Sequence, residues 1–412
     1  MAMIKTYRVM LCPNNVQNSR MFATAHTARY AYNWTLALQM RIYADTGKYL
    51  SNYEARKLFT EHKKEATWLY EVSNNATKQT IKDCCKAFQR FVAEKNKSGY
   101  TPYTVKQISK AACDGRTLTR YDMHGHPKFK KRGRVKPSFY MDTDKIAITE
   151  TRVRLEKLGL SRKRNKQCLN LIRLAEHGRI PTSATYTNPR IVFDGINWWL
   201  SVGVEVKREV SKPAGEGIGV DVGVKALAVI SDGDVYININ KTQKIRKLKK
   251  RQRRLQRKVS RKYQMNMEGE SYKKTGNIIK SEKELLKLNQ RLNGIRHNHL
   301  HQTSADIMKR EPSYIVTEDL NIKGMMKNKH LAKAIQEQGI AEFHRQIAYK
   351  SVWNGIEHIE APRYYPSSKT CSVCGFIKTD LKLNDRIYTC ECGNIIDRDL
   401  NAALNLKAYG AA

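Results

Sequence analysis

Four cysteines near the end of the chain constrain its fold more than any other feature. Two residues lie between Cys371 and Cys374, and after fifteen further residues Cys390 and Cys392 follow with one residue between them. Two close cysteine pairs on either side of a short loop are typical of a tetrathiolate zinc site. The sequence therefore predicts a zinc ribbon over 361–396 whose Zn²⁺ is structural. The alternative is a set of unmetallated thiols, and the tight second pair leaves the zinc geometry open.

Three acidic residues occupy the ends of separated elements. Asp221 lies within an apolar strand pattern, Glu318 ends another, and Asp399 stands where a helical pattern begins after the ribbon. Clustered carboxylates repel one another, and divalent cations relieve that repulsion. Two Mg²⁺ ions, or Mn²⁺ in their place, can bind the attacking and leaving oxygens of phosphodiester hydrolysis. Each acid alone could instead end a strand, pair with a lysine or cap a helix.

The composition indicates a polyanionic partner. The chain of 412 residues has 76 Lys and Arg against 38 Asp and Glu, a formal net charge of +38. A basic excess of this size favours nucleic acid over a membrane surface. The sequence has no apolar run of spanning length and no export signal, and its nine cysteines are an odd number. We therefore expect no membrane partner and a cytoplasmic location.

The first half of the chain is predicted to combine a barrel with a helical insertion. Residues 1–15 and 138–210 carry short patterns of period two, including a hairpin that turns at Asp194, and predict a small antiparallel β-barrel. The helical and loop-rich patterns of 16–137 interrupt this barrel as a separate helical domain. Residues 211–216 are predicted to be a linker.

Helix signals set further expectations. An apolar periodicity predicts a helix from Arg20 to Thr46, and a capping box at 51–54 begins the next one. In the second half, the pattern predicts a single helix over 331–350 and a loop over 321–329. The bounds of these helices and of this loop are predicted from local sequence patterns alone.

The second half, 217–412, has an α/β pattern. A strand passes through Asp221, a basic helix covers 241–262, and a second long helix covers 282–310. The two helices are predicted to pair as a basic helical hairpin over 241–310 because each carries an apolar seam.

Basic residues gather on three segments that are predicted to contact nucleic acid. A solvated helix surface or a disordered charged loop is the alternative for each. The helix after Ser73, the segment around Phe129 and the basic helix carry them. The predicted contacts are Lys78, Gln79 and Lys82; Lys128, Lys130 and Lys131; and Arg246, Lys250 and Arg254.

Four stretches resemble a known family. GIGVDVGVKALAVISDG, TEDLNIKGM, SSKTCSVCG and CGNIIDRDLNAALNL are similar to the three split motifs and the zinc element of the RuvC-type nuclease in TnpB proteins. These are insertion-sequence proteins related to the type V CRISPR nucleases. The resemblance implies an RNase H-like (RuvC) α/β nuclease domain with an inserted zinc ribbon. It also implies an N-terminal wedge β-barrel with an inserted helical recognition domain.

The resemblance also implies an activity. Members are RNA-guided endonucleases that cut double-stranded DNA beside a short transposon-associated motif, with a guide called ωRNA derived from the transposon end. Asp221 and Glu318 match the first two catalytic acids. The shared D-x-N-x-A pattern starts at Asp399 and selects it over Asp397. We expect a bacterial or archaeal, nucleoid-associated protein, with a monomer favoured over a dimer.

Three other interpretations are open. A compact type V CRISPR nuclease would use the same chemistry with a different guide. A nuclease-inactive, RNA-guided DNA-binding regulator would lack the acids that this chain retains. A cut-and-paste transposase would use the same acids, but the zinc ribbon before the third acid disfavours strand transfer.

Overall fold

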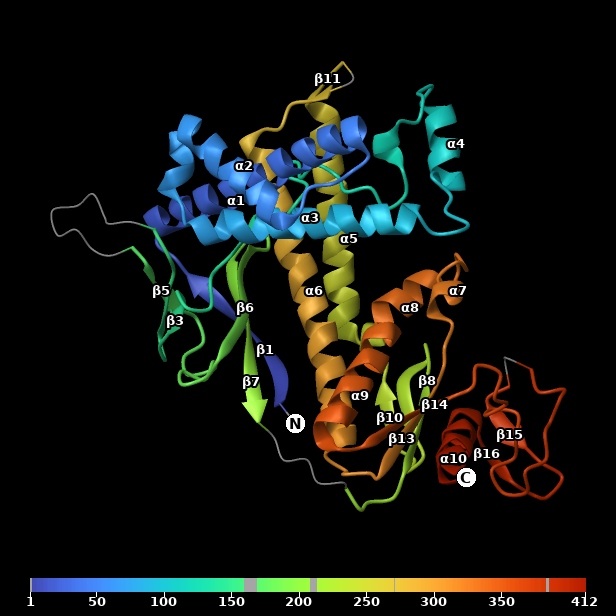
Figure 1. The fold of residues 1–412 in the computed structure, drawn as a ribbon. Helices are drawn as coiled ribbons and strands as arrows, with labels where there is room; N and C mark the ends of the chain where they lie inside the picture. Colours follow the sequence, from blue (N-terminus) through green and yellow to red (C-terminus); the bar gives the residue numbers. More distant parts are fainter. Residues whose placement is uncertain (1, 159–168, 208–212, 270, 383–384) are drawn as a thin grey trace. The chain divides into compact units, whose positions relative to one another are not determined.

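The chain divides into two compact units, 1–208 and 209–412 (Figure 1). The structure, a computed structural model, describes every residue except 1, 159–168, 208–212, 270 and 383–384. Two residues of the predicted linker, 211 and 212, therefore lie outside the described residues. Among the helices of the described ranges, none combines the length and apolarity that a bilayer span requires.

A seven-stranded antiparallel sheet forms the base of the first unit, with the strand order β2-β6-β7-β1-β5-β4-β3. Its strands are β1 (Ala2–Cys12), β2 (Ser138–Tyr140), β3 (Ala147–Ile148), β4 (Arg152–Arg154), β5 (Leu171–Leu174), β6 (Tyr186–Phe193) and β7 (Trp198–Lys207). Leu200, Val202 and Val204 of β7 alternate with more polar neighbours and enter the core, as the period of two predicts. The antiparallel sheet is confirmed, whereas its closure into a barrel stays a prediction.

The helices of the first unit follow β1 and precede β2. They are α1 (Asn15–Thr46), α2 (Asn52–Glu65), η1 (Thr67–Glu71), α3 (Asn74–Lys95), α4 (Val105–Cys113) and η2 (Arg120–Asp122). The capping box of Ser51 and Glu54 begins α2 as predicted. The predicted start of α1 at Arg20 is wrong, because a capping box of Asn14 and Gln17 begins the helix earlier than its apolar pattern does.

A five-stranded sheet with the order β10-β9-β8-β13-β14 forms the centre of the second unit. Its strands are β8 (Ile218–Val222), β9 (Ala226–Ile230), β10 (Val235–Ile237), β13 (Tyr314–Glu318) and β14 (Glu357–Ala361). Strands β8, β9 and β10 are antiparallel, while β8, β13 and β14 are parallel. The carboxyl ends of β8 and β13 therefore meet at one edge.

Helices cover this sheet and extend from it. They are η3 (Ile239–Lys241), α5 (Gln243–Met265), α6 (Gly276–Met308), α7 (Ile322–Met325), α8 (Ala332–Gln338) and α9 (Ile340–Asn354). A short hairpin, β11 (Met267–Glu268) and β12 (Ser271–Tyr272), joins α5 to α6. The two long helices pair through Ile245, Leu288 and Leu292, so the predicted helical hairpin is confirmed.

The expected single helix over 331–350 is wrong. Gly339 adopts a left-handed backbone, with φ of 74°, and separates α8 from α9. Its amide still donates to the Ile335 carbonyl, which closes the first helix. The loop predicted over 321–329 also contains the short helix α7.

The chain ends in a small ribbon followed by one helix. The elements are β15 (Ile387–Thr389), β16 (Ile395–Asp397) and α10 (Arg398–Ala411). β15 and β16 pair as an antiparallel hairpin. Helix α10 packs on β8 and β13 (Figure 1). The ribbon therefore lies directly before the helix that covers the central strands.

Candidate active site and metal centre

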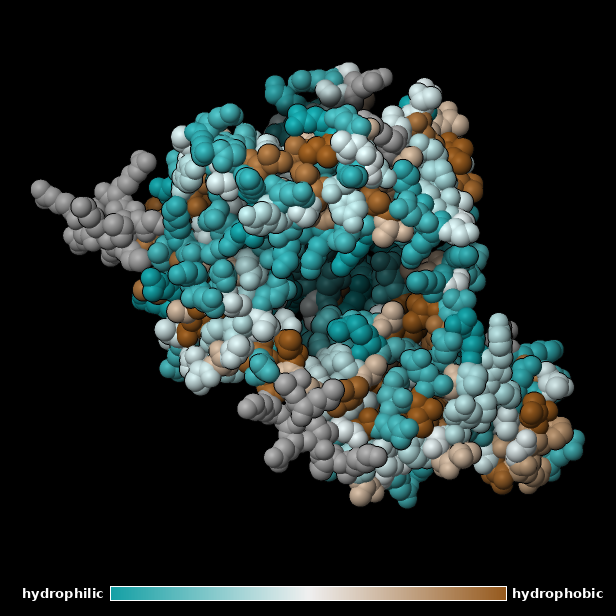
Figure 2. Space-filling view, in the orientation of Figure 1, coloured by the Kyte–Doolittle hydropathy of each residue, from teal (hydrophilic) through white to brown (hydrophobic). Residues whose placement is uncertain are grey.

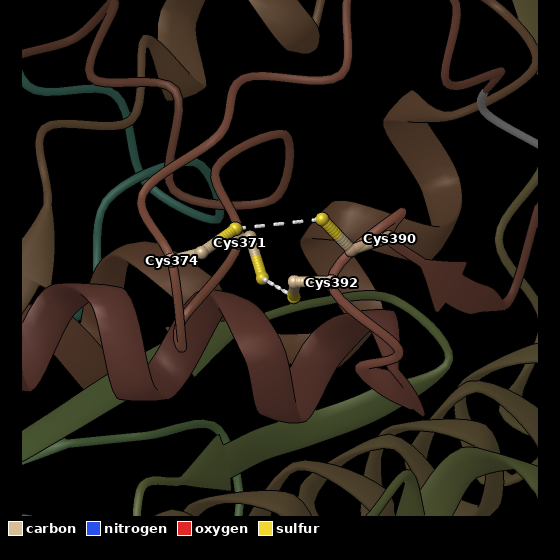
Figure 3. Close-up of side chains that lie close together, drawn as sticks. All are labelled: Cys371, Cys374, Cys390 and Cys392. Atoms are coloured by element: carbon tan, nitrogen blue, oxygen red, sulfur yellow. Dashed lines mark hydrogen bonds between the residues drawn. The ribbon is translucent and has the colours of Figure 1, made fainter.

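The four predicted zinc ligands converge (Figure 3). Their sulfur atoms all lie within 4.8 Å of one another. The Sγ atoms of Cys371 and Cys392 are 3.7 Å apart, and those of Cys374 and Cys390 are 3.5 Å apart. A tetrahedral zinc ion with Zn–S bonds of about 2.3 Å holds its sulfur ligands about 3.8 Å apart. The cluster therefore fits a structural zinc ion.

Two tight turns form this cluster. The amide of Gly375 donates to the Cys371 carbonyl, and the amide of Gly393 donates to the Cys390 carbonyl. Gly393 has a φ of 88°, which lets the chain turn directly after the short second pair. Although burial opposes it, hydrogen bonds from backbone amides and from Asn394 lower the pKa of Cys371 to about 6. Although a backbone hydrogen bond from Asn394 opposes it, hydrogen bonds with neighbouring thiols and burial raise the pKa of Cys392 to about 12. Zinc binding would therefore displace protons from the cluster.

The first two predicted acids lie on neighbouring parallel strands. The β8–β13 register pairs Ile218 with Ile315 and Val220 with Thr317. When this register is continued by one residue along each strand, Asp221 lies beside Glu318, where both strands reach the same edge of the sheet. Partners in register point to the same side of a sheet, so the two carboxylates share one face. Both side chains are half-buried.

The third acid reaches this edge because α10 packs closely on β8. A Cβ atom on Gly219 would lie 1.9 Å from the Ala403 carbonyl oxygen and 2.5 Å from the Lys407 amide. Only glycine permits this approach. Asp399 belongs to the first turn of α10, and its charge acts on Asp221 two residues beyond Gly219.

Burial and the charges of Glu318 and Asp399 act on the carboxylate of Asp221. Burial, followed by the charges of Glu318 and Asp399, raises the pKa of Asp221 to about 8, against an opposing effect of Arg398. Among the described residues, the cysteine cluster is the only group of three or more such ligands close enough to enclose an ion. The three carboxylates do not form such a group, so a cation between them would need waters and substrate oxygens as further ligands. Mg²⁺ suits such a site, because it keeps waters and takes phosphate oxygens beside a few carboxylates.

Asp397 has a separate role. Its carboxylate accepts hydrogen bonds from the amides of Asp399, at 2.9 Å, and of Leu400, at 3.3 Å, and so caps α10. Asp397, and not Asp399, therefore caps the helix. This division supports the choice of Asp399 as the third acid.

A group of uncharged residues behind the acids was not identified from the sequence. The buried Ser367 hydroxyl donates to Oε1 of Glu318. On α10, the side chains of Asn401 and Asn405 are buried and donate to carbonyls of the segment that contains Ser367. Two asparagines four residues apart on an otherwise apolar helix face were a signal for this contact.

The predicted contacts on α5 lie at the surface. Arg246, Lys250 and Arg254 recur every fourth residue and are exposed, so they form one stripe. Their neighbour Lys249 faces Glu337 instead, with an ion pair of 2.5 Å. Hydrophilic residues also cover much of the face shown in Figure 2.

The predicted contacts on α3 have different environments. Lys82 is exposed, whereas Lys78 is half-buried and lines a groove of about 690 Å³ beside Tyr53. Gln79 donates to the Asp83 carboxylate at 2.8 Å. Their contacts with nucleic acid stay predictions.

The segment before β2 contains one anchor and two exposed lysines. Lys128 and Lys131 are exposed. The Lys130 ammonium lies 3.8 Å from the centroid of the Tyr32 ring, and its backbone exchanges two hydrogen bonds with Asn33. Lys130 therefore fixes the segment to α1.

Family models match three parts of the chain. The OrfB_IS605 model, described as "Probable transposase", matches 201–329. A helix-turn-helix model of OrfB_IS605 proteins matches 1–48, where the structure has β1 and α1. The model described as "Cas12f1-like, TNB domain" matches 341–406.

Relatives cover the full chain. A protein of Streptomyces pristinaespiralis named "Putative RNA-guided DNA endonuclease" is 26% identical, over 99% of this chain and 90% of the relative. InsQ of Escherichia coli K12, with the same description, is 26% identical over 100% and 94%.

Solved structures give a weaker likeness. A Cas12f1–sgRNA–target DNA complex aligns at 15% identity over 98% of this chain and 99% of that chain, with a TM-score of 0.34. CasPhi-2 (Cas12j) bound to crRNA aligns at 10% identity over 98% of each chain, with a TM-score of 0.43. At these scores the likeness carries no argument about this chain.

Proposed function

We propose that the chain belongs to the TnpB family of insertion-sequence proteins and that it cuts double-stranded DNA selected by a bound guide RNA. One observation carries the nuclease part of this proposal. Asp221 and Glu318 lie side by side where two central strands of the second unit end, and the charge of Asp399 acts on Asp221, which supports a site shared by the three acids. The names of the full-length relatives support guidance by RNA and DNA as the substrate.

The fold proposed for the second unit is RNase H-like, of the RuvC type. Three antiparallel strands followed by two parallel ones, with α10 on the central strands, support this assignment. The zinc ribbon is inserted between β14 and α10. The antiparallel sheet of the first unit would be the wedge, and the helices between β1 and β2 the recognition domain. The proposed domains are 1–15 with 138–210, 16–137 and 217–412.

The proposed reaction is hydrolysis of a phosphodiester. Divalent cations, Mg²⁺ or Mn²⁺, would supply Lewis acidity to the attacking and leaving oxygens when bound. Asp221, Glu318 and Asp399 would hold them at the open edge of the sheet. Asp221 would give up its proton on loading, because its pKa of about 8 keeps it protonated at neutral pH without a cation. The products would carry 5′-phosphate and 3′-hydroxyl ends.

The metal of the ribbon has a different task. Cys371, Cys374, Cys390 and Cys392 form a closed site without room for a substrate, which supports a structural Zn²⁺. The ribbon would thus contribute to catalysis only by placing the elements on either side of it.

The proposed partners are a guide RNA from the transposon end (ωRNA) and a double-stranded DNA target. Base pairing would select the sequence, while the protein holds the heteroduplex by its backbone and reads a short adjacent motif. The exposed stripe of Arg246, Lys250 and Arg254 suits the holding task. The exposed Lys82, Lys128 and Lys131 of the first unit would add further backbone contacts.

The first test identifies the RNA. The gene is expressed with its native flanking DNA, and the RNA that copurifies with the protein is sequenced. A single structured RNA that overlaps the 3′ end of the gene is expected. Repeat–spacer RNAs would favour a compact type V CRISPR nuclease instead, and the absence of any specific RNA would overturn guidance by RNA.

The second test compares two neighbouring aspartates. With the identified guide and a matching target, Asp399→Asn is expected to slow cutting at least a thousandfold, about 4 kcal/mol of barrier, with guided DNA binding retained. Asp397→Asn is the matched control, because asparagine also caps helices, and it should cut within about threefold of the wild type. Full cutting by Asp399→Asn together with loss in Asp397→Asn would overturn the assignment. Full cutting by both would overturn the carboxylate mechanism.

A further inference from the structure

Ser367 connects the ribbon to one of the three acids. It is 3% exposed, and its hydroxyl donates to Oε1 of Glu318. Glu318 is the last residue of β13, so the strand fixes its backbone but not the direction of its carboxylate. A buried donor at a fixed position restricts that direction. Ser367 lies four residues before Cys371, the first cysteine of the zinc site.

The backbone around Ser367 is fixed by α10. Asn405 is 5% exposed, and its Nδ2 donates to the carbonyls of Ser367, at 2.7 Å, and of Thr370, at 2.6 Å. Asn401 is fully buried and also donates to the Thr370 carbonyl, at 2.6 Å. Its Oδ1 accepts from the amide of Ser372, the residue after Cys371. The two asparagines thus hold the segment that leads into the zinc site.

The same helix carries Asp399 in its first turn. Asp399 is therefore placed by α10 directly, and Glu318 is placed by α10 through Ser367. We infer that Ser367 is a positioning residue that orients the Glu318 carboxylate toward the metal shared with Asp399, and that Asn405 acts through it. This inference rests on the proposed nuclease function, because it assigns a purpose to the orientation of Glu318.

Cation binding without catalysis tests the inference. The full-length protein, loaded with zinc and free of nucleic acid, is titrated with Mn²⁺, and free Mn²⁺ is counted by electron paramagnetic resonance. Ser367→Ala is expected to raise the apparent Kd at least tenfold, since loss of a residue that orients a metal ligand costs about 10–100-fold in affinity. Asp221→Asn defines the background from sites elsewhere on the chain.

Ser372→Ala is the matched control. It also removes a serine hydroxyl from this segment, but Ser372 contacts Asn401 through its backbone amide. Its Mn²⁺ affinity should equal that of the wild type. Ser367→Thr retains the hydroxyl, so its Mn²⁺ affinity should stay within about threefold of the wild type. Loss of a residue that orients a metal ligand typically lowers the affinity tenfold or more.

Asn405→Ala tests the route through Ser367. If Asn405 acts through the serine, the double variant with Ser367→Ala should bind Mn²⁺ no more weakly than Ser367→Ala alone. Losses that multiply would overturn this part of the inference.

Two outcomes would overturn the role of Ser367 itself. One is a Ser367→Ala protein that binds Mn²⁺ as Ser372→Ala does. The other is a Ser367→Ala protein that has lost its zinc, because the serine would then support the ribbon rather than Glu318. Guided cutting provides a separate readout, in which Ser367→Ala should need a higher Mg²⁺ concentration for its half-maximal rate. A wild-type protein that cuts no DNA would refute the proposed function, while the Mn²⁺ titration would still decide the role of Ser367.

Discussion

The sulfur site and the carboxylate site of the second unit are built in opposite ways. The four cysteines lie within 371–392, and two tight turns bring them together. The proposed carboxylate site draws on Asp221, Glu318 and Asp399, so it depends on the register of the sheet and on the packing of α10 on β8. A local site can be inferred from spacing alone, whereas a site built from distant segments depends on the tertiary fold.

The two sites also differ in how complete they are. The sulfur atoms form a closed set of four ligands. The three carboxylates are not such a closed set, and burial, followed by repulsion from Glu318 and Asp399, raises the pKa of Asp221 to about 8. The first site should therefore need its metal to fold. The second should fold without a metal and be less stable because its charges are not neutralised.

Removal of the zinc is expected to have the largest effect. Cys390→Ser should lose the metal, and the segment 367–397 should lose its protection from hydrogen exchange, because structural zinc sites bind with about 10–16 kcal/mol in isolated peptides. Cutting should fall at least a hundredfold, because the residues that hold the metal ligands in place lose their own support. Guided DNA binding should persist. Metal analysis and hydrogen-exchange mass spectrometry measure the first two results.

The control for this substitution is Cys113→Ser, which changes an exposed cysteine of the first unit. It should leave zinc content and exchange unchanged. A Cys390→Ser protein without metal that still protects 367–397 would show that the ribbon folds by its apolar contacts, and the contrast between the two sites would disappear.

The close contact between β8 and α10 comes next in size. Gly219→Ala would place a methyl group on the Ala403 carbonyl and should destabilise the second unit by about 3 kcal/mol, at the upper end for an overpacked core. Urea unfolding measures the loss. The matched control is Gly294→Ala on α6, where nothing lies within 4 Å, and it should gain up to about 1 kcal/mol of helix propensity. Equal stability of the two variants would mean that α10 does not pack on β8 as the structure has it.

The difference between the sites explains what the sequence could predict. Cysteine spacing and the capping box at Ser51 are local patterns, and both led to geometry that the structure confirms. The three acids were singled out by their places at the ends of elements, but the choice of Asp399 over Asp397 depended on the D-x-N-x-A pattern of the family. Ser367 was missed because its partner lies 49 residues away. The pair of asparagines on α10 signals a buried contact, but the partner of Asn405 lies 38 residues away and local spacing does not identify it. Gly339 was missed because glycine is tolerated within helices, so its left-handed conformation depends on packing.

The smallest expected effect concerns the charge of Asp221. Its ordinary pKa is 3.8, and the fold raises it to about 8. Between these pH values Asp221 is ionised in the unfolded chain but protonated in the folded chain. The stability of the metal-free protein therefore falls as the pH rises from about 4 to about 8, and above about 8 Asp221 is ionised in both states. Asp221→Asn removes this dependence. The variant should therefore melt above the wild type by roughly 2–6 °C at pH 8, and by less at pH 5.

Divalent cations should reverse the order of the two melting temperatures. Mg²⁺ binds the folded wild type and should raise its Tm, whereas Asp221→Asn lacks one of the ligands and should respond less. Asp397→Asn keeps the cap of α10 and should stay close to the wild type, because the charge of Asp397 acts on Asp221 less than those of Glu318 and Asp399 do. Removing one ligand would then destabilise the sulfur site but stabilise the carboxylate site. If Asp221→Asn instead melts with the wild type from pH 5 to pH 9, the fold neither buries Asp221 nor brings the other two carboxylates close enough to repel it. The three carboxylates could not then share a cation without a rearrangement that substrate would have to induce.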